Sequence, residues 1–343
     1  MGHTVYILAP SFPGYKDHDK TIIRYPSLPN PIIKTYPIGI PLISTRKIKK
    51  INPDVVHTHH ALIFGQFGKQ ISEKLSIPLF FSAHTHYEHY IDFYFPFAKR
   101  LTKKIYDLDM KDLARKCYKV ICPSYQTEER LKSSFGINNT VVINNSIDDA
   151  FFTQPRKKSL AHPTLIFTGR LEKEKNLFFL LKIANELKKL IPGFRMLIIG
   201  TGSQADSLHD KIHKYHLEEN ILLAGELHRN LLPEIYKSAH LFITPSLSEV
   251  MPLTVIEALA CGLPTIALER SKLEDIVIDG KSGYLLKPNL KVIAKKISEI
   301  FSNEKLYARL SKNAYEHALN FSITQKAKEL ENLYKEAMTF SPR

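Results

Sequence analysis

The sequence predicts an α/β protein with two parallel β-sheets, each covered by helices on both faces. Short runs of β-branched and aromatic residues alternate with longer helical patterns through both halves of the 343-residue chain, which is typical of parallel sheets. The alternation breaks between Asp149 and Pro163, where prolines and a run of charges interrupt it, as expected of a junction between domains. Because each half is long enough to bury its own core, the pattern indicates two Rossmann-like domains.

The expected strands are the short apolar runs between the helical patterns, since strands buried on both faces are apolar throughout. In the first half they are Thr4–Ala9, Thr21–Tyr25, Asp54–Thr58, Leu79–Ala83, Lys119–Cys122 and Val141–Ile143. In the second half they are Thr164–Thr168, Arg195–Ile199, Ile221–Leu223, Leu241–Thr244, Pro264–Ala267 and Tyr284–Leu286. We place the first domain at residues 1–153, the second at residues 154–322, and a C-terminal helix that packs back towards the first domain at residues 323–343.

Composition narrows the class of protein, its compartment and its partners. Hydrophobic residues make up 44% of the chain and charged residues 24%, which is normal for a soluble globular protein. No run reaches the ~20 apolar residues of a membrane-spanning helix, and the first residues lack the layout of a signal peptide. The three cysteines have no paired spacing, so we expect reduced thiols in the cytoplasm. The net charge is +14, but no nucleic-acid-binding motif is present, so we expect no nucleic acid partner.

The segment Pro245–Pro264, PSLSEVMPLTVIEALACGLP, is the most informative part of the chain. Glu249 lies in its polar loop, and Glu257 follows inside the apolar run that begins a helix. The N-terminus of such a helix offers free N–H groups to a diphosphate. A carboxylate one turn inside the helix accepts hydrogen bonds from a ribose diol, and one in the preceding loop binds a sugar hydroxyl. The segment therefore predicts a nucleotide-sugar site, the alternative being a helix with two solvated glutamates.

Further landmarks accompany this segment in a fixed order. They are Thr168–Lys175 (TGRLEKEK), Leu197–Gly202, Leu223–Gly225, Asp279–Leu286 and a final helix opened by Phe321-Ser322. Together they resemble the donor site of retaining glycosyltransferases of the GT4 type, which have the GT-B fold. The resemblance implies two domains facing a cleft and a hexosyltransferase that uses UDP-glucose or a related nucleoside-diphosphate sugar. It also implies that neither a metal nor another cofactor is required.

The same resemblance assigns roles to individual residues. The donor-binding residues are then Gly169, Arg170, Lys175, Glu249, Val250, Met251, Pro252, Leu253, Thr254 and Glu257. Because the departing diphosphate gains negative charge as the glycosidic bond breaks, the cations Arg170 and Lys175 beside it would stabilise the transition state more than the ground state. The alternative is a pair of surface cations flanking a helix start. The retaining reaction of the family is assisted by the leaving phosphate, so we assign no dedicated nucleophile; the catalytic residues are His84 and Glu249.

A second resemblance covers part of the first half. The segments Asp54–Gly65 (DVVHTHHALIFG) and Ile77–Tyr90 (IPLFFSAHTHYEHY) look like paired motifs of glycosyltransferases that glycosylate diacylglycerol. This match makes His84 the active-site histidine, and the residues on the acceptor side are His57, His59, Tyr87 and Tyr90. The histidines also raise the possibility of a metal site, but their spacing is loose and no cysteine pair or HExxH motif lies nearby. We expect no metal.

The segment Tyr90–Tyr106 mixes six aromatic residues with four cations. Aromatic rings at the headgroup level and Lys or Arg near anionic lipid are typical of an interfacial segment. The alternative is a helix that packs on its own domain and holds its lysines in water. If the segment is interfacial, we expect a peripheral protein on the inner face of the cell membrane.

Three departures from the resembled family stand out. The chain reads Val250-Met-Pro-Leu253 where the family has a glycine-rich tetrad, and Pro252 lacks an N–H group. It reads Asn145-Ser-Ile-Asp148 where the family has Asn-Gly-Ile-Asp, which affects a turn. The family begins with a strand, a glycine-rich turn and a helix, whereas this chain begins at the next segment, Gly2–Pro10. We therefore expect the first strand and helix of the N-terminal domain to be missing.

The leading interpretation is transfer of a hexose to a membrane lipid such as diacylglycerol. A second keeps the donor and takes a surface polysaccharide or lipopolysaccharide as acceptor. A third, based on the missing strand and on Pro252, is a glycosyltransferase-like protein that binds nucleotide or a partner without turnover.

Overall fold

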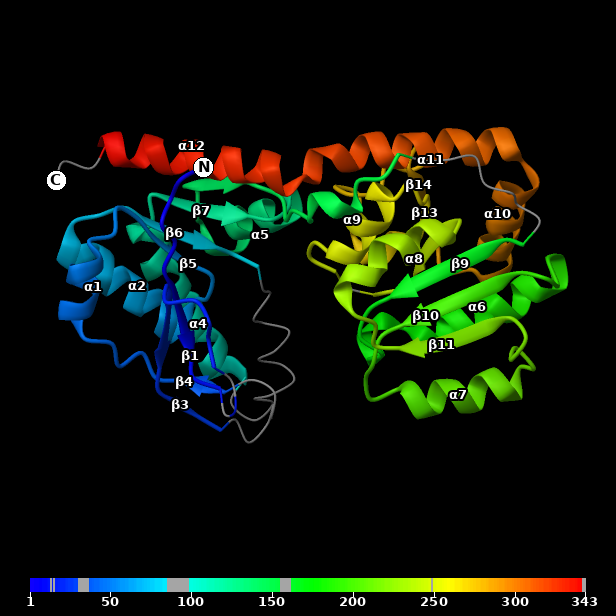
Figure 1. Cartoon of the computed structure of the whole chain (residues 1–343), viewed down its shortest axis with the longest axis horizontal. Helices are drawn as coiled ribbons and strands as arrows, with labels where there is room; N and C mark the ends of the chain where they lie inside the picture. The colour runs from blue at the N-terminus through cyan, green and yellow to red at the C-terminus, as the bar shows by residue number, and fades with distance from the viewer. Residues whose placement is uncertain are drawn as a thin grey trace. The chain divides into compact units, whose positions relative to one another are not determined.

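The computed structural model describes residues 1–12, 14, 16–29, 37–84, 99–154, 162–247 and 249–340. The chain divides into two compact units, of which the first contains residues 1–143 together with 331–343 and the second residues 144–330. Figure 1 shows the course of the chain through both units. The first unit ends at Ile143, ten residues before the boundary placed at residue 153, because Asn145 and Phe151 already pack and hydrogen-bond within the second unit.

The first unit is an α/β assembly with short strands. Its elements are β1 (Ile7–Pro10), β2 (Ile22–Tyr25), β3 (Ser27–Leu28), β4 (Ile38–Gly39), α1 (Thr45–Ile51), β5 (Val56–Thr58), α2 (Leu62–Leu75), β6 (Leu79–Ser82), α4 (Lys99–Lys116), β7 (Lys119–Cys122), α5 (Tyr125–Phe135) and β8 (Thr140–Val142). Strands β5, β6, β7 and β8 form a parallel sheet in that order, β1 pairs with β2 in parallel, and β3 pairs with β4 antiparallel. Among the described residues, β1 and β5 therefore each have a partner strand on one side, β2 and β6 respectively.

The second unit contains the larger sheet. Its elements are η2 (Asp149–Phe151), β9 (Thr164–Thr168), η3 (Lys173–Lys175), α6 (Leu177–Leu190), β10 (Arg195–Ile199), α7 (Ala205–Lys214), β11 (Ile221–Gly225), η4 (Arg229–Leu231), α8 (Leu232–Ser238), β12 (Leu241–Thr244), α9 (Leu253–Ala260), β13 (Thr265–Leu268), η5 (Glu269–Ser271), β14 (Gly283–Leu286), α10 (Leu290–Ser302), α11 (Glu304–Ala318) and η6 (Leu319–Phe321). The helix α12 (Ile323–Phe340) begins in this unit, and its residues from Glu331 onward group with the first unit.

Each predicted strand has a counterpart that differs by no more than three residues at either end. The short pair β3–β4 was not predicted, because two-residue strands show no alternation. All pairings in the sheet of the second unit are parallel. Because each of the two units is built around a parallel sheet, the predicted α/β class with two domains of parallel strands is confirmed.

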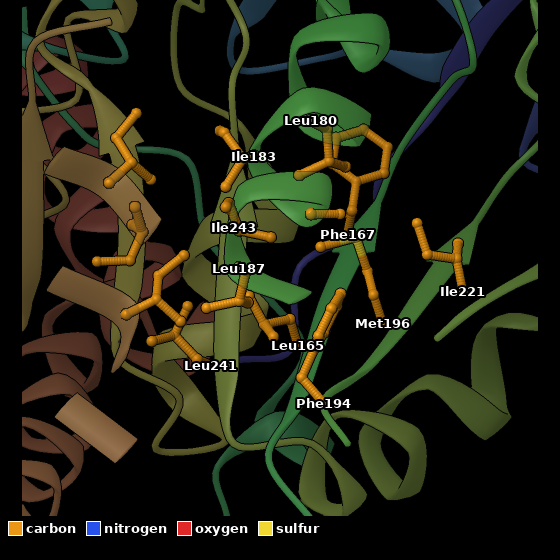
Figure 2. Packing of buried hydrophobic residues seen from close by; sticks show 14 of the residues in the cluster. Leu165, Phe167, Leu180, Ile183, Leu187, Phe194, Met196, Ile221, Leu241 and Ile243 are labelled. Carbon is orange, nitrogen blue, oxygen red and sulfur yellow. The ribbon is translucent and has the colours of Figure 1, made fainter. Parts of the chain in front are cut away.

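Alternating side chains of the second sheet supply two separate cores, as expected when helices cover both faces. Figure 2 shows one of them, in which Leu165 and Phe167 of β9 pack with Leu180 and Leu187 of α6. Ile166, between those two β9 residues, points to the other face and packs with residues of α8, α9 and α11. The continuous apolar run of β9 thus reflects burial on both sides.

The first unit has its own core between the four-stranded sheet and two helices. Leu79 and Phe81 of β6 pack with Met110 and Leu113 of α4, together with Leu131 of α5. The three cysteines are buried and none of them forms a disulfide in the described residues, and burial raises the pKa of the Cys117 and Cys122 thiols to about 12. Neither of these two thiols is therefore a nucleophile at neutral pH.

Truncation of Leu180, which is 0% exposed in α6, tests the packing of the second unit. We expect Leu180→Ala to lower the free energy of unfolding by about 3 kcal/mol, from the lost transfer energy and the cavity left behind. Leu190→Ala, on the same helix but 51% exposed, should change it by roughly 0.5 kcal/mol or less. Urea unfolding followed by circular dichroism measures both, and equal shifts for the two variants would contradict the packing described.

Candidate functional site

The second sheet has the strand order β11-β10-β9-β12-β13-β14. From β9 the chain proceeds outward through β10 to β11, and then returns to the other side of β9 as β12. Open parallel sheets bind ligands where the strand order reverses, at the carboxyl ends of the strands. In this unit that position lies between the ends of β9 and β12.

The turn after β10 requires glycine because its backbone passes close to the turn after β9. Gly169 donates its N–H to Ile199 O at 3.0 Å. A Cβ placed on Gly200, whose φ is +138°, would lie 1.9 Å from the carbonyl oxygen of Gly169. These contacts hold the chain so that Arg170 and the turn η3 follow directly at the carboxyl end of the strand.

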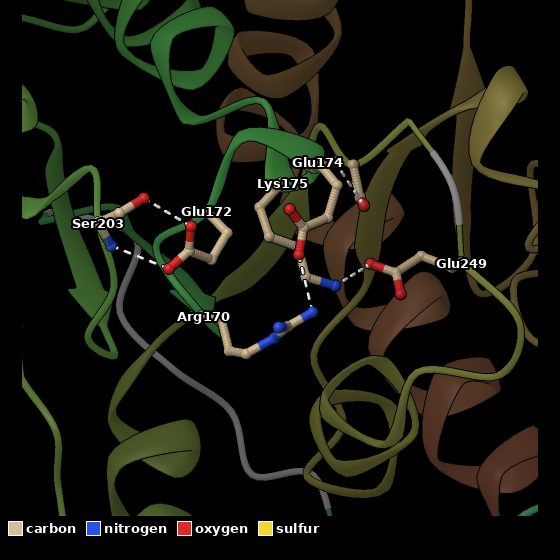
Figure 3. A network of polar contacts seen from close by, with 7 residues as sticks. Arg170, Glu172, Glu174, Lys175, Ser203 and Glu249 are labelled. Atoms are coloured by element: carbon tan, nitrogen blue, oxygen red, sulfur yellow. Dashed lines mark hydrogen bonds and ion pairs between the residues drawn. The ribbon is translucent and has the colours of Figure 1, made fainter. Parts of the chain in front are cut away.

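Two of the predicted donor cations are each paired with a carboxylate (Figure 3). Lys175 Nζ lies 2.6 Å from Glu249 Oε1, with side chains only 17% and 11% exposed. Arg170 Nη2 lies 2.7 Å from Glu174 Oε1, with both side chains substantially exposed. The structure therefore brings together Lys175 from the loop after β9 and Glu249 from the loop after β12, at the reversal of strand order.

Two hydrogen bonds to backbone carbonyls hold these two loops together independently of the ion pair. Asn176 Nδ2 donates to Pro245 O at 3.2 Å, and Leu247 N donates to Glu174 O at 3.2 Å. On the other side of the turn, Glu172 accepts from the backbone N and the hydroxyl of Ser203, at 2.9 and 2.6 Å. The loop after β9 is thus held at both ends, which fixes the cation positions.

The helix α9 starts at the predicted position and lacks a side-chain cap. Pro252 occupies its N-cap, with φ −71° and ψ 119°, and no side chain bonds to the N–H groups of the first turn. The missing N–H of Pro252 therefore lies outside the helix, and Leu253 and Thr254 keep theirs. Met251 is 5% exposed and packs into the core beside α9, so its side chain contributes to packing. Val250 lies in the same loop and is half-buried.

Glu257, in the second turn of α9, is 2% exposed. Its Oε1 lies 3.3 Å from Arg229 Nη2, and its Oε2 accepts a hydrogen bond from the Tyr236 hydroxyl at 3.3 Å. Burial raises the pKa of the Glu257 carboxyl, while Arg229 and the Tyr236 hydrogen bond oppose that rise. Both carboxylate oxygens thus have partners, as a buried charge requires.

Sequence reasoning missed Arg229 and Tyr236. Arg229 opens η4, the turn after β11, and its guanidinium also lies 5.7 Å from the centroid of the Phe151 ring. Tyr236 is 0% exposed in α8, and burial raises the pKa of its hydroxyl well above its ordinary value. The signal available was the position of Arg229 just beyond the carboxyl end of a predicted strand, where the other site residues also occur.

In the first unit, the predicted histidines lie together at the carboxyl ends of β5 and β6. The rings of His57 and His59 stack at 4.4 Å between centroids, and those of His59 and His84 at 5.3 Å. Tyr87 and Tyr90 lie outside the described residues, as does most of the segment before α4. Among the residues that the structure describes, no group of three or more His, Cys, Asp or Glu side chains is arranged to hold a metal ion.

Comparison with known proteins identifies the family. The model of glycosyl transferases group 1 matches residues 149–317, and the model of glycosyltransferase family 4 matches residues 1–151. The chain belongs to the GT4-type glycosyltransferases.

Individual relatives and structures agree with this assignment. The chain is 27% identical to an alpha-monoglucosyldiacylglycerol synthase of Acholeplasma laidlawii, over 97% of this chain and 89% of that protein. It is 25% identical to the protein of the same name from Streptococcus pneumoniae, over 83% and 68%. The structure of the Anabaena protein HepE in complex with UDP superposes with a TM-score of 0.73 at 18% identity, over 92% of this chain and 86% of that one. That likeness concerns the fold.

The Lys175–Glu249 pair offers a test of the site geometry. We expect Lys175→Met to lower the free energy of unfolding by about 3 kcal/mol, because it leaves a nearly buried carboxylate without its partner. Adding Glu249→Gln should restore much of this loss by removing the uncompensated charge. Arg170→Met, at the exposed pair with Glu174, should cost roughly 1 kcal/mol or less. Thermal melting of these three variants and of Glu249→Gln alone measures these differences, and additive effects of Lys175→Met and Glu249→Gln would argue against the pair.

Proposed function

We propose that this GT4-type glycosyltransferase transfers a hexose from UDP-glucose, or a related UDP-hexose, to a membrane lipid such as diacylglycerol. The observation that carries the donor half is the cluster at the reversal of strand order. There, Lys175 and Arg170 follow β9, and Glu249 and the uncapped N-terminus of α9 follow β12. Free N–H groups and two cations suit a diphosphate.

The chemistry follows from the charges. As the bond between sugar and diphosphate breaks, negative charge develops on the leaving phosphate, and fixed cations nearby stabilise that charge without reorganisation. Arg170 and Lys175 would be these cations. Glu249 would accept hydrogen bonds from sugar hydroxyls, and Glu257 would accept them from the ribose diol. We propose that the reaction retains anomeric configuration and needs no metal. His84 would lie beside the anomeric carbon.

An exposed face of α4 supports the lipid half of the proposal. Tyr106, Met110 and Leu113 lie on the buried face of this helix. A second apolar row, Leu101, Ile105 and Leu108, repeats the same spacing elsewhere on the helix and is 65%, 55% and 60% exposed.

The charges of α4 separate in the same way. Asp109 and Asp112 hydrogen-bond to residues of α2, whereas Arg100, Lys103 and Lys104 are exposed near the second apolar row. An apolar row beside cations suits an anionic membrane surface.

No helix in the described part of the chain is long and apolar enough to cross a membrane. We propose a peripheral association through α4 and the aromatic segment that begins at Tyr90, at the inner face of the cell membrane. The names of the relatives from Acholeplasma laidlawii and Streptococcus pneumoniae, which are alpha-monoglucosyldiacylglycerol synthases, support a diacylglycerol acceptor for this chain.

Glu257→Gln tests the nucleotide site. Calorimetric titration should show UDP binding to the natural protein and a loss of about 1.5–3 kcal/mol in the variant, because charged hydrogen bonds to the ribose are removed. Glu316→Gln, on the exposed face of α11, should leave the affinity unchanged. Burial raises the pKa of Glu257 above 4.5, so its charged form is present above that raised pKa. Affinity should fall as the pH drops through it, and Glu257→Gln should lack this dependence. Absence of UDP binding by folded protein would refute the donor assignment.

Charge reversal on the exposed face of α4 distinguishes between the two candidate acceptors. Reversal of Arg100, Lys103 and Lys104 to Glu should weaken sedimentation with phosphatidylglycerol vesicles by at least roughly 100-fold, since each cation near an anionic surface contributes ~1 kcal/mol. The matched control reverses Lys291, Lys295 and Lys305, which are exposed on α10 and α11, and should retain binding. Equal partitioning of both variants would favour a surface polysaccharide or lipopolysaccharide as acceptor. Transfer of labelled glucose to diacylglycerol, in the presence of EDTA, measures the activity itself.

A further inference from the structure

Three imidazole rings in the first unit form a continuous row. His57 belongs to β5, His59 follows that strand, and His84 follows β6. Because β5 and β6 are adjacent and parallel, with Thr58 paired to Phe81, their carboxyl ends bring the rings together. The ring centroids of His57 and His59 lie 4.4 Å apart, and those of His59 and His84 lie 5.3 Å apart. A hydrogen bond of 3.1 Å also joins His59 Nδ1 to His84 Nε2.

The inner end of the row is anchored at both nitrogens of His57. Its Nδ1 lies 2.5 Å from the hydroxyl of Tyr334, on α12, and its Nε2 lies 2.8 Å from the hydroxyl of Ser82, at the end of β6. Burial, and to a smaller extent the neighbouring His59 and His84, lowers the pKa of His57 to about 3. Burial also raises the pKa of Tyr334. The His57 ring and the Tyr334 hydroxyl are therefore neutral at physiological pH. The hydroxyls of Tyr334 and Ser82 can each donate to a bare ring nitrogen or accept from a protonated one.

This anchorage determines the orientation of the ring. The χ2 torsion of histidine is broad and roughly two-fold, so packing alone does not distinguish a ring from its flipped form. Hydrogen bonds at both nitrogens do, because a flip would place carbon atoms against the two hydroxyls. A fixed His57 presents a fixed face to His59, and His59 in turn holds the Nε2 of His84.

We propose that His57 and His59 are positioning residues for His84, and that the hydroxyl of Tyr334 on α12 is the anchor of the row. The proposal rests on the proposed function, which places His84 beside the reacting carbon. It adds that a residue near the C-terminal end of the chain, 250 positions after His84, governs the orientation of that imidazole. The competing explanation is a packed cluster in which the hydroxyl of Tyr334 has no effect on His84.

Two tyrosines of the first unit make a matched pair for the test. Tyr334→Phe removes only the hydroxyl and keeps a ring that packs on Phe80 at 4.9 Å. Tyr118→Phe also removes a hydroxyl that bonds across to α12, at 2.8 Å from Glu336 Oε1, and Tyr118 likewise contacts Phe80, at 5.7 Å. The hydroxyl of Tyr118 bonds to a carboxylate of α12 rather than to a histidine, so Tyr118→Phe controls for the loss of a tether to the helix.

The experiment combines kinetics with NMR of protein that carries ¹⁵N-labelled histidine. With UDP-glucose and diacylglycerol in phosphatidylglycerol vesicles, we expect kcat of Tyr334→Phe to fall roughly 10-fold or more, because a misplacement of ~1 Å costs up to about 100-fold. The KM for UDP-glucose should stay within about twofold, as in Tyr118→Phe, since the diphosphate residues lie in the other unit. The ring nitrogen resonances of His84, assigned from their absence in His84→Gln, should shift in Tyr334→Phe and stay in place in Tyr118→Phe.

A substitution within the row gives a second test if Tyr334→Phe is poorly folded. His59→Asn keeps an amide near the position of Nδ1 and should retain more kcat than His59→Leu, which is of similar bulk and makes no hydrogen bond. Unchanged His84 resonances in Tyr334→Phe, or an unchanged kcat, would overturn the positioning role, as would equal kcat values for the two His59 variants. If the resonances shift as expected but the natural protein transfers no glucose, the coupling of Tyr334 to His84 holds and the proposed function fails.

Discussion

The site proposed here for the sugar donor depends on the adjacency of β9 and β12. These strands are separated along the chain by two complete strand–helix units, and they pair because the chain returns past its own starting strand. Connections between parallel strands must cross over a face of the sheet, so the loops after β9 and β12 turn away to opposite faces. They leave the space between them open at the carboxyl edge. Lys175 and Glu249 are brought within 2.6 Å by that topology, although 74 positions separate them in the sequence.

The same topology imposes an electrostatic requirement. A site for a doubly charged diphosphate needs cations and free N–H groups, and recognition of sugar and ribose hydroxyls needs carboxylates, all within a partly buried volume. Placed alone, each buried charge would be strongly destabilising. The structure pairs them instead: Glu249 with Lys175, and Glu257 with Arg229 and the Tyr236 hydroxyl. We infer that substrate binding exchanges some of these internal partners for ligand atoms, which limits the net affinity but keeps the site stable without ligand.

The sequence predicted the features that have a local cause. The strands of both sheets follow from their apolar runs, and α9 from its proline start and glycine end. The loop positions of Arg170, Lys175 and Glu249 follow from the strands before them. Arg229 and Tyr236 were missed because their contacts with Glu257 exist only once η4 and α8 lie beside α9 in the folded unit. The pairing of Lys175 with Glu249 was missed for the same reason, since the two residues had been assigned to different parts of the donor.

The contact between Tyr334 and His57 shows the same limit over a sequence separation of 277 positions. Nothing in the pattern of α12 distinguishes Tyr334 from an ordinary tyrosine on an amphipathic helix, and DVVHTHH gives no indication of which histidine loses most of its contact with water. Only folding of the first unit half-buries His57, and the neutral ring there bonds to two neutral partners. Ser82 is available locally from β6, but the second partner has to come from a distant element.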